Sequence, residues 1–127
     1  MILEIEKTVL EVGTTGIWKW RKYSDKTVDF FGKIPLLNTD VTAAFSTWYR
    51  GPNLYESTAY EYPFIMTEAP ALVMTFQTRN GQGAIPWIFS IDADTAQRYV
   101  PQCYLIRPTT ATGISGNINV IGRGKLP

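Results

Sequence analysis

Alternation of apolar and polar side chains, with a period of two residues, is the feature that most limits how this chain can fold. The alternation is clearest in residues 17–23 and 27–34, which Ser24-Asp25-Lys26 separates. β-Branched and aromatic residues dominate both runs, and this combination is typical of strands rather than helices. The two runs and the polar segment between them therefore predict a β-hairpin.

Later runs have the same strand-forming composition, and they cover residues 41–48, 71–79, 87–91, 103–107 and 117–121. The first of these runs is a strand candidate that also permits a short helix, because it contains Ala43-Ala44. Asn80-Gly81 follows the second run and predicts that it forms a hairpin with the third, through a longer loop. The small and polar segment 108–116 separates the last two. Strands at this spacing predict an all-β fold of sandwich or barrel type.

Residues 1–12 are expected to form a short stub before the domain. The apolar residues in 2–10 fit either a short amphipathic helix or a strand. A helix this short would need partner copies, as in a coiled-coil shaft. The glycines of Gly13-Thr14-Thr15-Gly16 favour a turn or a flexible joint. We therefore expect one domain over residues 13–127.

The composition excludes several classes of function. The chain has no histidine, which argues against most hydrolase triads and zinc sites, and its single cysteine, Cys103, cannot form an intramolecular disulfide. We expect Cys103 to be a small buried hydrophobe. The formal net charge of +1 predicts no nucleic-acid partner. No basic, apolar signal peptide or membrane-spanning run is present, so we expect a soluble chain without membrane insertion.

A longer motif occupies residues 16–33, which read Gly-Ile-Trp-Lys-Trp-Arg-Lys-Tyr-Ser-Asp-Lys-Thr-Val-Asp-Phe-Phe-Gly-Lys. This tryptophan-rich strand, Arg-Lys pair, tight turn and strand ending in an aromatic residue and glycine resembles the C-terminal domains of tail fibres in phages and prophages of Gram-positive bacteria. Tyr62-Pro63-Phe64, residues 69–73 and residues 115–125 are similar to later segments of that family, in the same order. The resemblance covers most of the chain, from about Gly13 to Lys125.

The resemblance implies both an architecture and a role. Such domains are antiparallel β-sandwiches, here expected as a jelly-roll-like head, and they are commonly homotrimers. They are made in the bacterial cytoplasm and act at the tail tip of the virion. There they bind a saccharide or a protein on the surface of the bacterial host.

The densest group of aromatic and hydrogen-bonding residues lies in residues 46–64. Aromatic rings stack on the C–H face of a sugar, while Asn, Glu and Arg side chains satisfy its hydroxyl groups. An alternative is that these rings cover the open end of a sandwich or fill an oligomer interface. The predicted ligand-binding residues are Trp48, Tyr49, Arg50, Asn53, Tyr55, Glu56 and Tyr60.

The basic and aromatic strand at residues 18–23 is a weaker binding candidate. Alternation places Trp18 and Trp20 on the opposite side of the strand from Arg21, so we favour a core or subunit-interface role for these rings. The basic residues would then be solvated or packed by their stems.

No catalytic site, metal site or cofactor is predicted. Glu56, Glu61 and Glu68 could pair as acid and base in glycoside hydrolysis, but any acidic loop meets that criterion. Asp92-Ala93-Asp94 lacks the full ligand set of a calcium loop and fits turn capping better. The glycines of residues 113–116 and 122–124 open no helix that could hold a phosphate, and turns explain them.

The sequence therefore favours an adhesion module, a trimeric fibre tip whose loops bind a carbohydrate on the host surface. The alternative is a structural virion or tail-assembly protein whose aromatic surface makes only protein–protein contacts. An enzyme that degrades surface polysaccharide is the weakest of the three. Exposed aromatic rings beside an empty concavity would favour adhesion, rings buried between chains would favour the structural role, and two convergent carboxylates would favour the enzyme.

Overall fold

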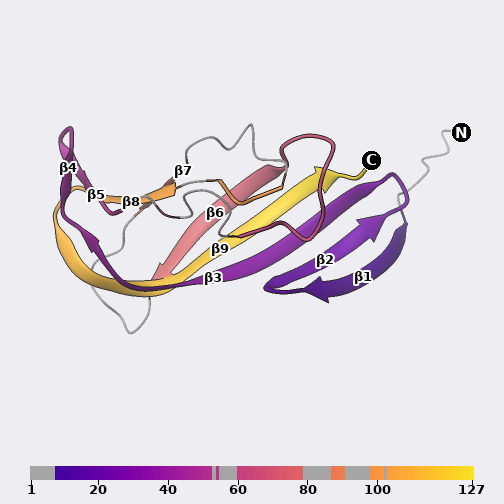
Figure 1. The fold of residues 1–127 in the computed structure, drawn as a ribbon, viewed down its shortest axis with the longest axis horizontal. Helices are drawn as coiled ribbons and strands as arrows, with labels where there is room; N and C mark the ends of the chain where they lie inside the picture. The colour runs from indigo at the N-terminus through magenta and orange to yellow at the C-terminus, as the bar shows by residue number, and fades with distance from the viewer. Residues whose placement is uncertain (1–7, 53, 55–59, 79–86, 91–97, 102) are drawn as a thin grey trace, which may run out of the picture.

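The computed structural model describes residues 8–52, 54, 60–78, 87–90, 98–101 and 103–127. The strands, all antiparallel, are β1 (Val9–Thr15), β2 (Trp18–Tyr23), β3 (Thr27–Val41), β4 (Ala43–Phe45), β5 (Trp48–Arg50), β6 (Ala71–Thr78), β7 (Trp87–Ser90), β8 (Cys103–Arg107) and β9 (Ala111–Lys125). One sheet has the order β1-β2-β3-β9-β6 and the other β4-β5-β8-β7 (Figure 1). The predicted all-β fold is confirmed.

The hairpin predicted from the alternating runs is β2 and β3. Their register runs from Trp18 opposite Gly32 to Lys22 opposite Val28. The turn is held by Asp25, whose carboxylate accepts hydrogen bonds from the backbone N–H and the hydroxyl of Thr27. A short polar side chain that hydrogen-bonds its own backbone two residues on is the usual device for such a turn.

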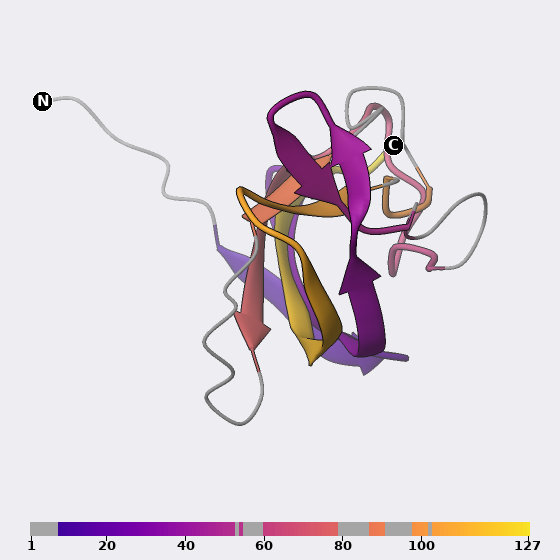
Figure 2. The same cartoon turned by 90° about the vertical axis from the view of Figure 1, so that its left-hand side faces the viewer.

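Strands β3 and β9, each of 15 residues, connect the two sheets. They pair from Thr27 opposite Lys125 to Val41 opposite Ala111, and the register shifts twice after Leu36. Irregularities of this kind bend a strand and increase its twist. The pair accordingly curves at one end toward β4, β5 and β8 (Figure 1). Figure 2 views the molecule from this end, with β4 and β5 in front and β6 beside β9.

The core lies between the five-stranded sheet and the residues that cover one of its faces. On β3 the buried side chains alternate with outward ones, as Val28, Phe30 and Ile34 show. Cys103 and Leu105 of β8 are fully buried against this face, so the two sheets form a sandwich-like arrangement and the expected burial of Cys103 is confirmed.

Residues 60–66 and 98–101 close the core beside β2. The indole Nε1 of Trp18 donates a hydrogen bond of 2.6 Å to the carbonyl of Glu61. Trp18 packs edge-on against Phe30, with ring centroids 5.4 Å apart, and both rings contact Tyr62. The preferred core role of Trp18 and Trp20 is therefore confirmed for Trp18, which is 3% exposed, while Trp20 is partly buried against Phe64.

The second predicted hairpin is wrong. Strand β6 pairs with β9 in the five-stranded sheet, whereas β7 pairs with β8 in the four-stranded sheet. Along β6, Leu72, Met74 and Phe76 pack against the buried core of the five-stranded sheet. Burial of this apolar face beside β9 decides the pairing, and adjacency in the sequence does not.

The run at residues 41–48 is neither a single strand nor a helix. It contains β4 and a turn, followed by β5, with Phe45 opposite Trp48. Ser46 has a φ of 58° in that turn, a backbone conformation that ends a strand.

The glycine segments expected as turns lie mostly within strands. Residues 113–116 and 122–124 belong to β9, and β1 continues through Gly13 to Thr15, so it crosses the expected boundary at residue 12. Gly16, with a φ of 58°, begins the turn to β2. At Gly13 and Gly122 the glycine provides space, because a ring, that of Trp20 or Phe30, occupies the position of the missing side chain, whereas Gly113 has a φ of 66°, a conformation that favours glycine.

No membrane-spanning helix occurs in the part of the chain that the structure describes. The helix-or-strand alternative for residues 2–10 lies largely outside the described residues, although Val9 and Leu10 belong to β1.

Candidate functional site

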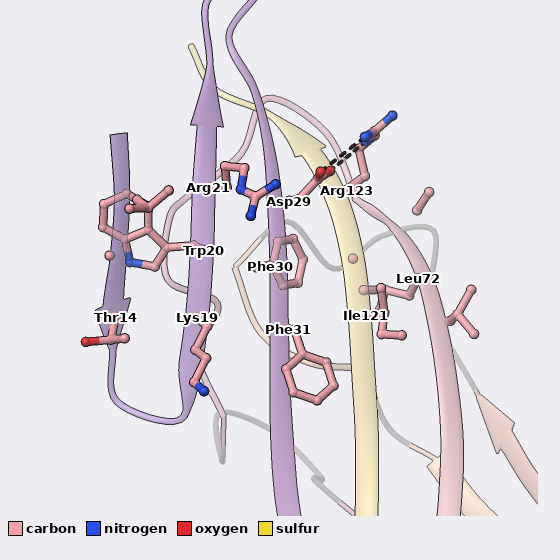
Figure 3. A pocket seen from close by; sticks show the side chains of 15 residues that line it. Thr14, Lys19, Trp20, Arg21, Asp29, Phe30, Phe31, Leu72, Ile121 and Arg123 are labelled. Carbon is pink, nitrogen blue, oxygen red and sulfur yellow. Dashed lines mark hydrogen bonds and ion pairs between the residues drawn. The ribbon is translucent and has the colours of Figure 1, made fainter. Parts of the chain in front are cut away.

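The candidate site is the face of the five-stranded sheet that points away from the core. We call this surface the outer face, and its central residues are Val12 and Thr14 of β1, Lys19 and Arg21 of β2, Asp29 and Phe31 of β3, Ala71 and Val73 of β6, and Ile121 and Arg123 of β9. Along β3 and β9 these residues alternate with buried ones, and along β6 they alternate with partly buried ones. They line a shallow depression of about 900 Å³ (Figure 3).

One row across the outer face is mainly apolar. The strand register places Lys19 beside Phe31, Phe31 beside Ile121 and Ile121 beside Val73. The ring of Phe31 is half-buried, while Ile121 is 52% exposed and Val73 is 58% exposed. Large apolar side chains gathered on one open surface are typical of binding sites.

The adjacent row is charged. Asp29 lies between Arg21 on β2 and Arg123 on β9. Arg123 holds the Asp29 carboxylate through two hydrogen bonds, Nε to Oδ1 at 2.7 Å and Nη2 to Oδ2 at 3.1 Å (Figure 3). The hydroxyl of Tyr23 donates a further hydrogen bond of 2.8 Å to Oδ2. The pKa of Arg123 is raised, first by the hydrogen bond to Asp29 and then by the attraction of its charge.

Two further cations point into the depression, Lys19 and Arg21 (Figure 3). Within the described residues, neither is hydrogen-bonded or ion-paired to another side chain. Asp29 is already engaged by Arg123 and Tyr23. The depression therefore combines an apolar floor with positive charge available to a ligand.

The structure places the predicted ligand-binding residues in separate locations. Trp48, Tyr49 and Arg50 form β5 in the four-stranded sheet. The Arg50 guanidinium lies over the ring of Tyr104, 4.8 Å from its centroid, and Tyr49 packs against the core cluster around Leu105.

Tyr60 lies away from β5, and it packs against the core beside Trp18. It lines a smaller depression of about 450 Å³ with Glu61, Phe64 and Ile65. Asn53, Tyr55 and Glu56, also predicted to bind ligand, lie outside the described residues. The proposed loop site is thus neither assembled nor contradicted by the described part of the chain.

The described residues offer little to acid–base or metal chemistry. Glu61 is ion-paired with Arg98 through the guanidinium Nε, and Glu68 is exposed. No group of three or more histidine, cysteine, aspartate or glutamate side chains suited to a metal occurs among them. Burial raises the pKa of the Cys103 thiol to about 12, which leaves it neutral and unreactive at physiological pH. The Asp92-Asp94 pair lies outside the described residues.

Sequence reasoning separated the tryptophans of this strand from Arg21 but treated the basic residues as solvated or packed by their stems, so it missed the outer face that they form with neighbouring strands. The available signal was the alternation itself. A strand that buries Trp18 must present Lys19 and Arg21 on the other side. The same rule applied to Phe30-Phe31 places one ring in the core and the other on the opposite face.

Comparisons of the chain with protein-family models, with curated proteins and with solved structures found no match.

Proposed function

We propose that this protein is the receptor-binding tip of a phage or prophage tail fibre, located at the tail tip of the virion, and that it binds a saccharide on the bacterial surface without catalysis. The observation that carries the proposal is the outer face, where exposed apolar side chains and cations line one depression of about 900 Å³. Two strands of this face, β2 and β3, contain most of the motif at residues 16–33 that resembles tail-fibre domains.

The two rows of the outer face suit the two sides of a sugar ring. A pyranose presents a C–H surface that packs on an aromatic or aliphatic side chain, here Phe31 and Ile121. Its hydroxyl groups accept hydrogen bonds from Lys19 and Arg21. Because the sheet fixes the strands in register, these groups are held in place before the ligand arrives, which reduces the entropy lost on binding.

A structural role in the virion or in tail assembly is the second candidate. It is favoured by the same exposed Val12, Val73 and Ile121, because apolar patches also mark protein interfaces. In that case the apolar row would contact a neighbouring protein and no saccharide would bind.

The test of the proposal is Phe31→Ala, measured as attachment to host cells and to isolated wall polysaccharide. Removing a ring that packs on the ligand is expected to weaken binding by about 1 kcal/mol or more, which is roughly fivefold or greater. Phe45→Ala is the matched control, because Phe45 is a 41% exposed ring on β4, in the other sheet. Thermal unfolding checks that both variants remain folded.

Two further variants locate the site. Trp48→Ala and Tyr60→Ala test the residues that the sequence favoured. Reduced attachment in these variants, with Phe31→Ala unchanged, would contradict an outer-face site and return it to the loops. Attachment unchanged in all of them would favour the structural role.

A further inference from the structure

We propose that the outer face selects a carboxylated glycan, a saccharide polymer bearing uronic-acid-type carboxylate groups. This inference rests on the proposed saccharide-binding function and adds the chemical class of the ligand. It follows from the distribution of charge, from the way Arg123 already holds a carboxylate, and from the size of the depression.

Positive charge is concentrated on the outer face, although the whole chain has a formal net charge of only +1. The described strand residues on this side include two acids: Asp29, which is paired with Arg123, and Asp40 near the end of β3, whose carboxylate accepts a hydrogen bond from the backbone N–H of Gly113. The basic residues that alternation places on the same side of β2, β3 and β9 are Lys19, Arg21, Lys33, Arg123 and Lys125. Such a field attracts an anionic ligand and disfavours a cationic one.

In the Asp29–Arg123 pair, a guanidinium of this surface already holds a carboxylate. A planar guanidinium meets a planar carboxylate through two hydrogen bonds, the arrangement that gives Arg–carboxylate pairs their strength and geometric specificity. Arg21 presents the same group on the other side of Asp29 without a hydrogen-bond partner among the described residues. It can therefore bind a carboxylate supplied by the ligand.

Anion binding here depends on side chains, since the backbone N–H groups of the central strands β2, β3 and β9 serve the sheet ladders. Phosphate sites typically use a cradle of free backbone N–H groups or a helix N-terminus. A carboxylate needs fewer donors, so Arg21 with Lys19 is sufficient for it.

A second copy of this chain is a poor occupant of the outer face. Two outer faces packed against each other would bring like charges from Lys19, Arg21 and Arg123 together, and such contacts are destabilising. A depression of about 900 Å³ also falls within the range of small-ligand sites, as expected for a few sugar units. Phe31 and Ile121 would then contact the sugar rings while Arg21 binds a carboxylate.

The experiment measures binding of the full chain to an array in which each acidic glycan is paired with its carboxyl-reduced counterpart. Carboxyl reduction keeps the sugar ring and removes the charge. We expect binding to acidic members and at least a tenfold loss on reduction, because a hydrogen bond to a charged group contributes on the order of that factor. Raising the salt concentration should weaken the same binding.

Arg21→Gln should reproduce the effect of carboxyl reduction, lowering affinity for the acidic glycan about tenfold while leaving the weak binding to the reduced glycan unchanged. Arg98→Gln is the control, since it removes one positive charge from an exposed ion pair beside the core-closing segment. Thermal unfolding should be similar for both variants.

The outcomes separate this inference from the proposed function. Equal binding to acidic and reduced glycans that still requires Phe31 would overturn the carboxylate specificity and retain saccharide binding. Preference for acidic glycans that Arg21→Gln does not change would also overturn it. Absence of glycan binding, with or without capture of an acidic protein, would overturn both proposals.

Discussion

Tyr62 illustrates how a single residue carries opposing contributions to stability. Its ring packs against Trp18 and Phe30 and is 5% exposed, so it contributes to the core. Its hydroxyl is buried and has no hydrogen-bond partner within the described residues. Burial also raises the pKa of this hydroxyl, which therefore stays protonated.

Removing that hydroxyl should stabilise the protein. A buried hydroxyl without a partner costs about 1–3 kcal/mol, so Tyr62→Phe is expected to raise the free energy of unfolding or leave it unchanged. Tyr23→Phe is the matched comparison, because the Tyr23 hydroxyl donates to Asp29, and its loss should lower stability by about 1 kcal/mol. Urea unfolding of both variants measures the difference. A lower stability for Tyr62→Phe would show that its hydroxyl has a partner.

At the scale of strands, pairs of a glycine with an aromatic ring recur across the five-stranded sheet. Gly32 lies opposite Trp18, and Gly122 lies opposite Phe30. In each pair the ring covers the glycine, at the place where a Cβ atom would stand. The glycine leaves room for a large ring on a crowded inner face, and the ring shields the exposed backbone of the glycine.

A methyl group at such a position should disrupt the sheet. Gly122→Ala would place a Cβ atom in steric clash with the ring of Phe30. Overpacking of this kind typically lowers the free energy of unfolding by about 1–3 kcal/mol. Phe30→Leu in the same chain should reduce that cost, because the smaller side chain removes the clash. The free energies of unfolding of the two single variants and the double variant form the measurement. Strictly additive values would contradict direct packing between these positions.

At the scale of the whole molecule, several large apolar residues lie outside both the core and the depression of the outer face. Leu10 is 68% exposed, Leu37 is 64% exposed and Ile65 is 57% exposed. Seventeen of the 127 residues are aromatic, which is more than a small sandwich core absorbs easily. Contacts with other copies of the chain would cover part of this surface.

We therefore expect a homotrimer, the assembly that the proposed fibre-tip role implies. Three copies would also combine individually weak sites through avidity. Light scattering should give a mass near three times the 14.3 kDa of one chain. A strict monomer at micromolar concentration would contradict the trimer and weaken the case for multivalent adhesion.

Local pattern alone determined much of this fold. Strand-forming composition identified the strands β6, β7 and β8. Period-two alternation identified the β2–β3 hairpin, because the alternation of side chains across a strand is a property of the backbone itself. By the same rule, Trp18 and Arg21 lie on opposite faces of β2. The absence of histidine from the sequence argued against most zinc sites and hydrolase triads, because such sites need this residue type whatever the fold.

Tertiary structure decided which strands pair and where side chains gather. Strands β6 and β7 are neighbours in the sequence, yet they belong to different sheets. The outer face brings Arg21 and Asp29 of the β2–β3 hairpin together with Arg123 of β9, which is 94 residues away from Asp29, and no local pattern encodes the β3–β9 register. Conversely, Trp48 and Tyr60 are near in sequence but occupy separate parts of the fold. Proximity between strands depends on burying one continuous core, which is a property of the whole chain.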